Sequence, residues 1–201
     1  MVKVKNKRKS REERIEEIRV AAIESFIKKG YQNTTMEDII SLTELSKGGF
    51  YHYYSSKKEI LLDIMKDSNI LYINYDENMV KLNKDLSFDE KKKILIDAIL
   101  DKFIYTSDLK LLYTIFACEI HVDPELLEAF MEFENTFFKF LGEKIGVNVD
   151  ENIEIFKLVS RSLNGLIFSQ NLFKETDIFS NNREAFKKFY EPIIDDILKR
   201  T

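Results

Sequence analysis

A short run of residues in the N-terminal third of the chain combines hydrogen-bond donors with small side chains. It contains Ser46, Lys47, Gly48, Gly49, Tyr51 and His52. Each glycine inside a helix costs about 1 kcal/mol relative to alanine, so the glycines bring no stability. A missing side chain does let a second backbone come close. Lys47 adds a cation, and the N–H groups at a helix start favour phosphate. These residue types suit contact with a phosphate backbone.

Two short helical patterns place this run at the start of a helix. The first pattern runs from Thr35, with Asp38 at the capping-box spacing, to Leu42. The second runs from Ser46, a predicted N-cap, to Tyr53, and the four-residue connector Leu42-Thr43-Glu44-Leu45, which begins with the last residue of the first pattern, precedes it. Two short helices joined by a tight turn predict a helix-turn-helix, whose second helix enters the DNA major groove. The alternative is a capped loop in a helical bundle, with the glycines as breakers.

The residues around the second helix fit the same interpretation. Phe50 and Tyr54 are four residues apart and share one face, so we expect them to dock this helix onto its neighbours. Lys57 and Lys58 fall in the first turn of the next helix, where cations can meet DNA phosphates.

The charge of the chain is unevenly distributed. The whole sequence of 201 residues carries a net charge of -4, but residues 1–58 carry +5 and the remainder -9. Six bases and no acid lie within the first eleven residues: Lys3, Lys5, Lys7, Arg8, Lys9 and Arg11. Such asymmetry indicates an anionic partner for the basic segment, and a basic arm of this kind can reach nucleic acid. A disordered solubilising tail is the other interpretation of the arm.

The composition predicts an all-α protein of about nine helices. Only 6 glycines and 2 prolines occur, which favours long helices with short loops over many strands. Successive cap patterns divide the chain at Ser10–Glu13, Thr35–Asp38, Ser46, Ser56–Glu59, Ser87–Glu90, Asp108, Asp123–Pro124, Asp150, and Asn181 or Asn182. Pro192 falls inside the last pattern, where a kink or restart is expected.

Several classes of protein are disfavoured by what the sequence lacks. One cysteine, Cys118, excludes an internal disulfide, and although His121 follows it at a C-x-x-H spacing, we expect no metal site. We also expect no cofactor and no enzymatic activity, because no HExxH, GxSxG, P-loop or dinucleotide fingerprint occurs. No apolar run is long enough to span a membrane, and the basic N-terminus lacks the apolar core of a signal peptide, so we expect a cytoplasmic protein.

The stretch from Arg14 to Met65 resembles the N-terminal domain of TetR-family (tetracycline-repressor-like) transcriptional regulators. The residues that carry the resemblance, in order, are Phe26, Gly30-Tyr31, Thr34-Thr35, Ile39, Ser46-Lys47-Gly48, Phe50-Tyr51-His52-Tyr53-Tyr54, Ser56-Lys57 and Leu61. The resemblance implies a DNA-binding helix-turn-helix domain over 1–58, with a C-terminal helical domain for ligand binding and dimerisation over 59–201. It also implies DNA contacts from Thr34, Thr35, Ser46, Lys47, Gly48, Gly49, Tyr51, His52 and Lys57.

Two positions depart from the pattern of the family. Thr43-Glu44-Leu45 stands where many members have a glycine in the turn, so this turn must use another conformation or hold Glu44 under strain. Gly49 replaces a common threonine, which removes one possible contact to phosphate or base.

In the C-terminal part, the family pattern implies a ligand pocket and a dimer interface. The pocket candidates are Tyr72, Tyr105, Tyr113, Phe116, Glu119, His121, Phe133, Asn135 and Phe137. The interface candidates are Ser162, Leu163, Leu166, Phe186, Phe189, Tyr190 and Ile193, which lie on apolar stripes at helical spacing. Both sets can also be explained as packing within the core of one chain.

The sequence therefore predicts a homodimeric regulator that binds double-stranded DNA and responds to a small-molecule effector, as a repressor released from a palindromic operator. A nucleoid-associated or division-linked DNA-binding protein without an inducer is the alternative. An activator shares every one of these features, and a purely structural bundle would lack DNA affinity.

Overall fold

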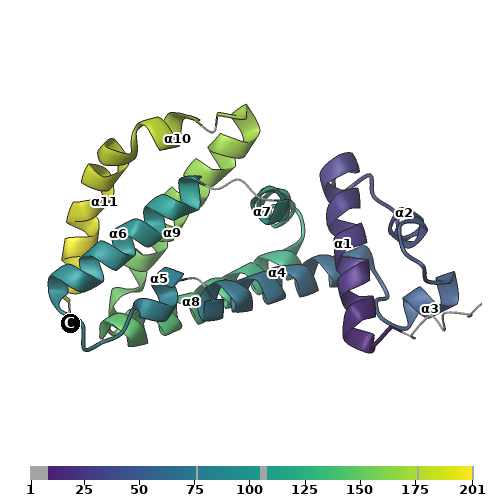
Figure 1. Cartoon of the computed structure of the whole chain (residues 1–201), viewed down its shortest axis with the longest axis horizontal. Helices are drawn as coiled ribbons and strands as arrows, with labels where there is room; N and C mark the ends of the chain where they lie inside the picture. The colour runs from purple at the N-terminus through teal and green to yellow at the C-terminus, as the bar shows by residue number, and fades with distance from the viewer. Residues whose placement is uncertain (1–8, 76, 105–107, 176, 201) are drawn as a thin grey trace, which may run out of the picture. The chain divides into compact units, whose positions relative to one another are not determined.

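The computed structural model is all-α and describes residues 9–75, 77–104, 108–175 and 177–200 (Figure 1). Side chains are described for these residues except 69–75, 102–104 and 179. The helices in these ranges are α1 (Arg11–Lys29), α2 (Met36–Ser41), α3 (Lys47–Tyr51), α4 (Lys57–Tyr75), α5 (Glu77–Lys81), α6 (Phe88–Ile104), α7 (Asp108–Glu119), α8 (Pro124–Ile145), α9 (Val149–Phe173), α10 (Asp177–Asn181) and α11 (Arg183–Leu198). The chain divides into two compact units, Met1–Ile64 and Met65–Thr201. None of the described helices combines the length and apolarity needed to cross a bilayer.

The N-terminal unit is built around the buried face of α1. That helix begins at Ser10, whose hydroxyl accepts from the Glu13 N–H at 3.1 Å while the Glu13 carboxylate accepts from the Ser10 N–H. It ends at Gly30, where φ is +78°. The core of the unit consists of Ile18, Ala22, Phe26, Ile39, Phe50, Ile60 and Leu61, each with no exposed surface. Burying a large aliphatic or aromatic side chain of this kind contributes about 1.5–3 kcal/mol, and this burial holds α1, the short helices α2 and α3, and the start of α4 together.

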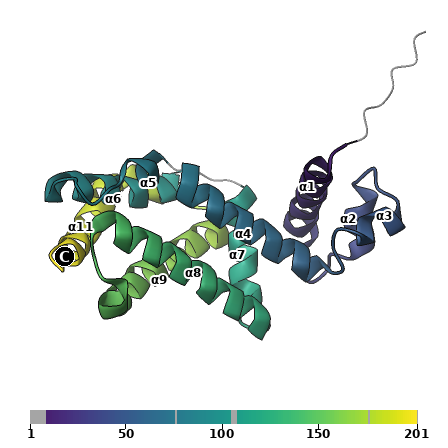
Figure 2. The same cartoon turned by 90° about the horizontal axis from the view of Figure 1, so that it is seen from below.

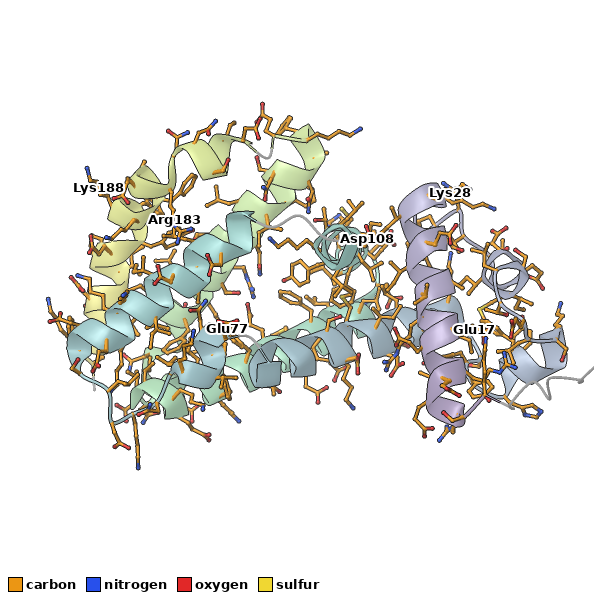
Figure 3. All side chains as sticks on the ribbon, viewed as in Figure 1. Glu17, Lys28, Glu77, Asp108, Arg183 and Lys188 are labelled. Carbon is orange, nitrogen blue, oxygen red and sulfur yellow. The ribbon has the colours of Figure 1, made fainter. Side chains whose placement is uncertain are left out.

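The C-terminal unit has α6 and α11 side by side, as Figures 1 and 2 both show. Ion pairs join the two helices near both ends of α11. Lys92 on α6 lies 2.9 Å from Asp195 on α11, and Arg183, labelled in Figure 3, lies 3.5 Å from Asp97 on α6. Helix α9 packs against α6, α7, α8 and α11. The core between them includes Leu95, Ile99, Phe138, Phe156, Leu163, Ile167, Tyr190 and Ile194.

The nine predicted helices are α1 to α4, α6 to α9 and α11, and the structure differs from the prediction in some details. The short helices α5 and α10 were not predicted from the sequence. Asn148, and not Asp150, caps α9, because its side chain accepts from the Asp150 N–H at 3.1 Å. Of the kink or restart expected at Pro192, the restart is wrong, since α11 continues through this residue, and the kink stays a prediction. Asn182 precedes α11 without a side-chain cap.

Candidate nucleic-acid interface and effector cavity

Capping interactions fix both helices of the helix-turn-helix. Thr35 caps α2: its hydroxyl accepts from the Asp38 N–H, and the Asp38 carboxylate accepts from the Thr35 N–H at 2.9 Å. Lys29 of α1 also donates to Asp38, at 2.6 Å, and this bond together with the one from Thr35 lowers the pKa of Asp38 to about 2. Ser46 caps α3 by accepting from the Gly49 N–H at 3.2 Å. The start of the second helix is therefore placed where the sequence predicts it.

The turn between α2 and α3 avoids backbone strain by using side chains. Among the described residues other than glycine, positive φ occurs at Lys174 and not at Glu44. The Glu44 N–H donates to the carboxylate of Glu17 at 2.7 Å, and Glu17 projects from α1 (Figure 3). The Thr43 hydroxyl accepts from the Leu45 N–H at 3.3 Å. Of the two outcomes expected for a turn without glycine, the structure shows the unstrained one.

The exposed face of α3 carries the predicted donors. Tyr51 is 41% exposed, and His52 at the C-terminal end of the helix is also exposed. Lys47 is exposed and pairs with Glu37 of α2 at 2.7 Å, which raises the pKa of the lysine and lowers that of the carboxyl. On the opposite face Phe50 is fully buried. As predicted, this face docks the helix: the Tyr54 hydroxyl donates to Asp63 of α4, which also accepts from Arg19 of α1.

The two glycines of α3 differ in their surroundings. A Cβ added to Gly48 would meet no atom within 4 Å, whereas one added to Gly49 would lie 3.2 Å from the Ser46 Oγ. The fold of this unit therefore does not require glycine at position 48, and glycine inside a helix lowers stability relative to alanine. A close approach by a molecule outside the chain is a physical reason to keep this position bare.

Three of the residues assigned to DNA by the resemblance are occupied inside the protein. The Thr34 side chain is buried, and its hydroxyl lies 2.8 Å from the Gly30 carbonyl oxygen and 3.1 Å from that of Ser25. The Thr35 N–H donates to the Asp38 carboxylate. Capping and burial explain both positions without DNA.

Lys57, expected to hold a phosphate, instead ties α4 to the segment between α1 and α2. Its ammonium donates to the carbonyl oxygens of Tyr31 at 2.6 Å, Thr34 at 2.9 Å and Gln32 at 3.1 Å. The same ammonium lies 4.6 Å from the centre of the Tyr31 ring. An ammonium has three protons, and these three bonds use them. The basic arm up to Arg8 lies outside the described residues.

A cavity of about 830 Å³ lies within the C-terminal unit, between residues of α4 to α9. Its aromatic lining is Tyr113, Phe116, Phe130, Phe133, Phe137, Phe138 and Phe156, and its polar lining is Ser68, Glu77, Asn78, Asp101, Lys110, Glu134, Ser160 and Asn164. Four pocket candidates, Tyr113, Phe116, Phe133 and Phe137, therefore line this cavity. Glu119, His121 and Asn135 do not. Tyr105 and the side chain of Tyr72 lie outside the described residues.

The interface candidates fall into two groups. Leu163 and Tyr190 are buried in the core of their own chain, so this structure assigns them to packing. Ser162, Leu166, Phe186 and Ile193 are half-buried, and Phe189 is 59% exposed. Leu158 and Leu172 on α9 are exposed to the same degree as Phe189. Gly165 lies between these leucines on α9, and a Cβ there would meet no atom within 4 Å.

Comparison with known proteins matches both parts of this arrangement. Residues 18–64 match the family model for bacterial regulatory proteins, tetR family. An uncharacterized HTH-type transcriptional regulator from Lactococcus lactis is 23% identical over 189 residues, covering 89% of this chain and 93% of the relative. The HTH-type negative transcriptional regulator IcaR of the biofilm operon in Staphylococcus aureus is 24% identical over 143 residues, covering 70% of this chain and 64% of that protein. The solved structure of Salmonella enterica GusR shares the fold with a TM-score of 0.73 at 16% identity, over 96% of this chain and all of that one.

A capped helix-turn-helix in the N-terminal unit, followed in the chain by a second unit made of helices, is typical of a DNA-binding transcriptional regulator. The chain belongs to the TetR family of helix-turn-helix transcriptional regulators, which is not a family of enzymes.

Proposed function

We propose that the protein is a homodimeric repressor that a small molecule releases from a palindromic operator. The observation that carries this proposal is the aromatic cavity of about 830 Å³ in the C-terminal unit. This volume is in the range of small-molecule sites, and a DNA-binding protein without an effector has no need of it. The printed name of IcaR, a negative regulator, supports repression over activation. The proposed location is the cytoplasm, where the operator is found.

Helix α3 reads the operator in this proposal. Its exposed donors Lys47, Tyr51 and His52 face away from the buried Phe50, and Gly48 leaves room for the DNA backbone. Glu37 holds Lys47 in the free protein, and a DNA phosphate or guanine would replace that carboxylate. Since both side chains are largely exposed, the exchange costs little.

The proposed dimer uses the exposed apolar side chains of α9 and α11. Leu158, Leu172 and Phe189 are each about 60% exposed, and Gly165 lets a second helix come close. A two-fold dimer supplies two copies of α3, one for each of two successive major grooves, which is the arrangement that reads a palindrome. An effector acts by binding more tightly to the state that does not fit the operator, and only that difference in affinity can shift the population.

Selection of binding sites from random DNA tests the proposal. We expect a palindromic site bound by two protomers, with affinity that falls steeply as salt rises. Lys47→Ala and Tyr51→Phe should each weaken binding severalfold, with thermal stability nearly unchanged. A reporter gene placed behind the selected site should be repressed.

Other outcomes would contradict parts of this proposal. Many unrelated genomic sites and no response to any effector would favour a nucleoid-associated role. Activation of the reporter would overturn repression but keep the operator.

A further inference from the structure

The wall of the cavity contains a charged residue that is almost fully buried. Glu134 on α8 has a side chain that is only 7% exposed, and it lines the cavity. Arg161 on α9 holds this carboxylate with both terminal nitrogens, one of them at 2.8 Å. The Ser160 hydroxyl donates to the same carboxylate at 2.7 Å. The ion-paired carboxylate of Glu134 thus links α8 to α9 at the wall of the cavity.

The guanidinium of Arg161 shows what kind of group this site accepts. Its central carbon lies 5.2 Å from the centre of the Phe130 ring, so a planar cation is stacked on an aromatic face while it pairs with Glu134. Further rings surround Phe130: the ring centres of Tyr113 and Phe116 each lie 6.3 Å away. Carboxylate, hydroxyl and aromatic rings together form a binding site for a flat, delocalised positive charge.

The two partners of this ion pair differ in their access to water. The side chain of Arg161 is 49% exposed, whereas that of Glu134 is 7% exposed. Arg161 can therefore turn into solvent and keep its charge hydrated, but Glu134 cannot. A buried, ionised carboxylate without a cation is strongly unfavourable, so the ionised form of Glu134 is stabilised by a positive partner. A cation that enters the cavity can take the place of Arg161 as that partner.

The rest of the cavity also favours a cation. Glu77 and Asp101 add two carboxylates to its lining, against one base, Lys110, and Asp101 also lies 3.6 Å from Arg183 of α11. Burial lowers the pKa of Lys110 to about 8, so its positive charge is held less firmly than that of an ordinary lysine. The aromatic walls provide apolar surface for the uncharged part of a ligand.

We propose that the effector is an aromatic cation that takes over Glu134 and releases Arg161 from it. This inference rests on the proposed function, in which the cavity receives the effector. Release matters because Arg161 lies three residues after Leu158 and four residues before Gly165, on the same face of α9 as the proposed dimer surface. Exchange at Glu134 therefore moves a charged side chain at the edge of that surface.

Three probes of similar size and shape test the proposal on the full-length protein without DNA. They are para-phenylbenzamidine, a cation at neutral pH with N–H donors alone, para-phenylbenzamide, which is neutral and has both donors and an acceptor, and para-phenylbenzoate, an anion with acceptors alone. We expect titration calorimetry to show the cation binding at least about tenfold more tightly than the amide, and the anion binding most weakly. Tighter binding of the amide or the benzoate, or no binding of any probe, overturns the proposal.

Variants of the ion pair separate ligand exchange from a structural role. Glu134→Gln should remove the preference for the cation. Arg161→Met frees the carboxylate, and so should strengthen binding of the cation by about tenfold. A purely structural pair predicts weaker binding in both variants, and this result would overturn the exchange.

The double variant Glu134→Gln/Arg161→Met leaves no unpaired charge and guards against a failure to fold. It should bind the neutral amide as the wild type does and show no preference for the cation; a retained preference would contradict the assignment of Glu134. Operator binding is measured separately, without probes, and tests the proposed function. A failure of the aromatic-cation proposal can therefore be distinguished from a failure of the proposed function.

Discussion

Gly48 is a residue whose identity the folded chain does not require. Its helical position lowers stability, and the space beside it is empty in the structure. We therefore interpret this space as the place where the DNA backbone approaches α3.

Replacing Gly48 with alanine tests this interpretation. We expect Gly48→Ala to leave the free energy of unfolding unchanged or to raise it by up to about 1 kcal/mol. The added methyl group should obstruct the DNA backbone and weaken operator binding by about tenfold. Thermal unfolding and fluorescence anisotropy measure the two effects.

Gly142 provides the matched control for this substitution. A Cβ there would lie 2.3 Å from the Val149 Cγ2 and 2.8 Å from the Val147 carbonyl oxygen. Gly142→Ala should therefore lower the free energy of unfolding by about 1–3 kcal/mol. If Gly48→Ala bound the operator like the wild type, the empty space would have no connection with DNA.

Lys57 illustrates contacts that could not be predicted from the sequence, while its predicted phosphate contact stays a prediction. A lysine in the first turn of a helix is compatible with a phosphate contact, and no local pattern reveals that three carbonyls from a distant segment surround it. The same holds for Thr34, whose acceptors lie four and nine residues away in the chain. Partners of this kind are set by tertiary packing, so spacing alone could not predict them.

Lys57→Met distinguishes the two roles. We expect the free energy of unfolding to fall by about 2 kcal/mol, because three carbonyls lose a charged donor. The dependence of operator affinity on salt should stay as in the wild type. A phosphate contact would instead leave stability unchanged and reduce the slope of log K against log salt by about 0.9.

At the scale of helices, caps were the most informative feature of the sequence. Ser10, Thr35, Ser46 and Asp123 act as N-caps at the positions predicted for them. Their bonds run to backbone N–H groups within three residues, so the sequence contains all that is needed to predict them. The five-residue helices α5 and α10 lack such a pattern and were missed.

The cap of α2 should give unit Met1–Ile64 a dependence on pH. The pKa of Asp38 is about 2 in the folded chain, below its ordinary value of 3.8, because Lys29 and Thr35 donate to its carboxylate. A group with a depressed pKa contributes stability that is present above its unfolded value and is lost as pH falls through the folded value. That contribution should therefore disappear between about pH 4 and pH 2.

Comparison with Asp38→Asn isolates this effect from the other carboxylates. Urea unfolding of both proteins should show the wild type to be more stable at neutral pH and the difference to shrink as pH falls toward 2. A difference that stays constant across this range would show that ionised Asp38 does not stabilise the cap.

At the scale of the whole molecule, the aromatic cavity could be predicted only in part. A helix turns by about 100° per residue, so an error of one residue exchanges a buried position for an exposed one. Asn135 was selected from the sequence and is exposed, whereas the adjacent Glu134 is buried on the cavity wall. Aromatic residues are frequent in these helices and their rings are large, so a prediction that is wrong by one residue can still name a ring near the cavity. Four of the predicted aromatic residues line it: Tyr113, Phe116, Phe133 and Phe137.

The proposed dimer is tested by placing a charge on its surface. Phe189→Arg should weaken self-association by at least about thirtyfold, because a large exposed ring near the centre of an interface contributes about 2 kcal/mol or more. Light scattering over a range of concentrations measures the change.

Val122→Arg serves as the control, because Val122 is 66% exposed in the turn before α8 and lies outside the proposed surface. A Phe189→Arg protein that remained dimeric, or a Val122→Arg protein that dissociated, would place the interface elsewhere.

The turn between α2 and α3 has a consequence for how this protein can evolve. Glu17 and Arg14 on α1, with Lys9 before it, hold Glu44 through hydrogen bonds and ion pairs. The orientation of α3 therefore depends on side chains that lie far from it in the sequence. Inherited substitutions on α1 are expected to shift which operators the protein prefers, while every residue of α3 stays the same. Related sequences in which α3 is identical need not share a target.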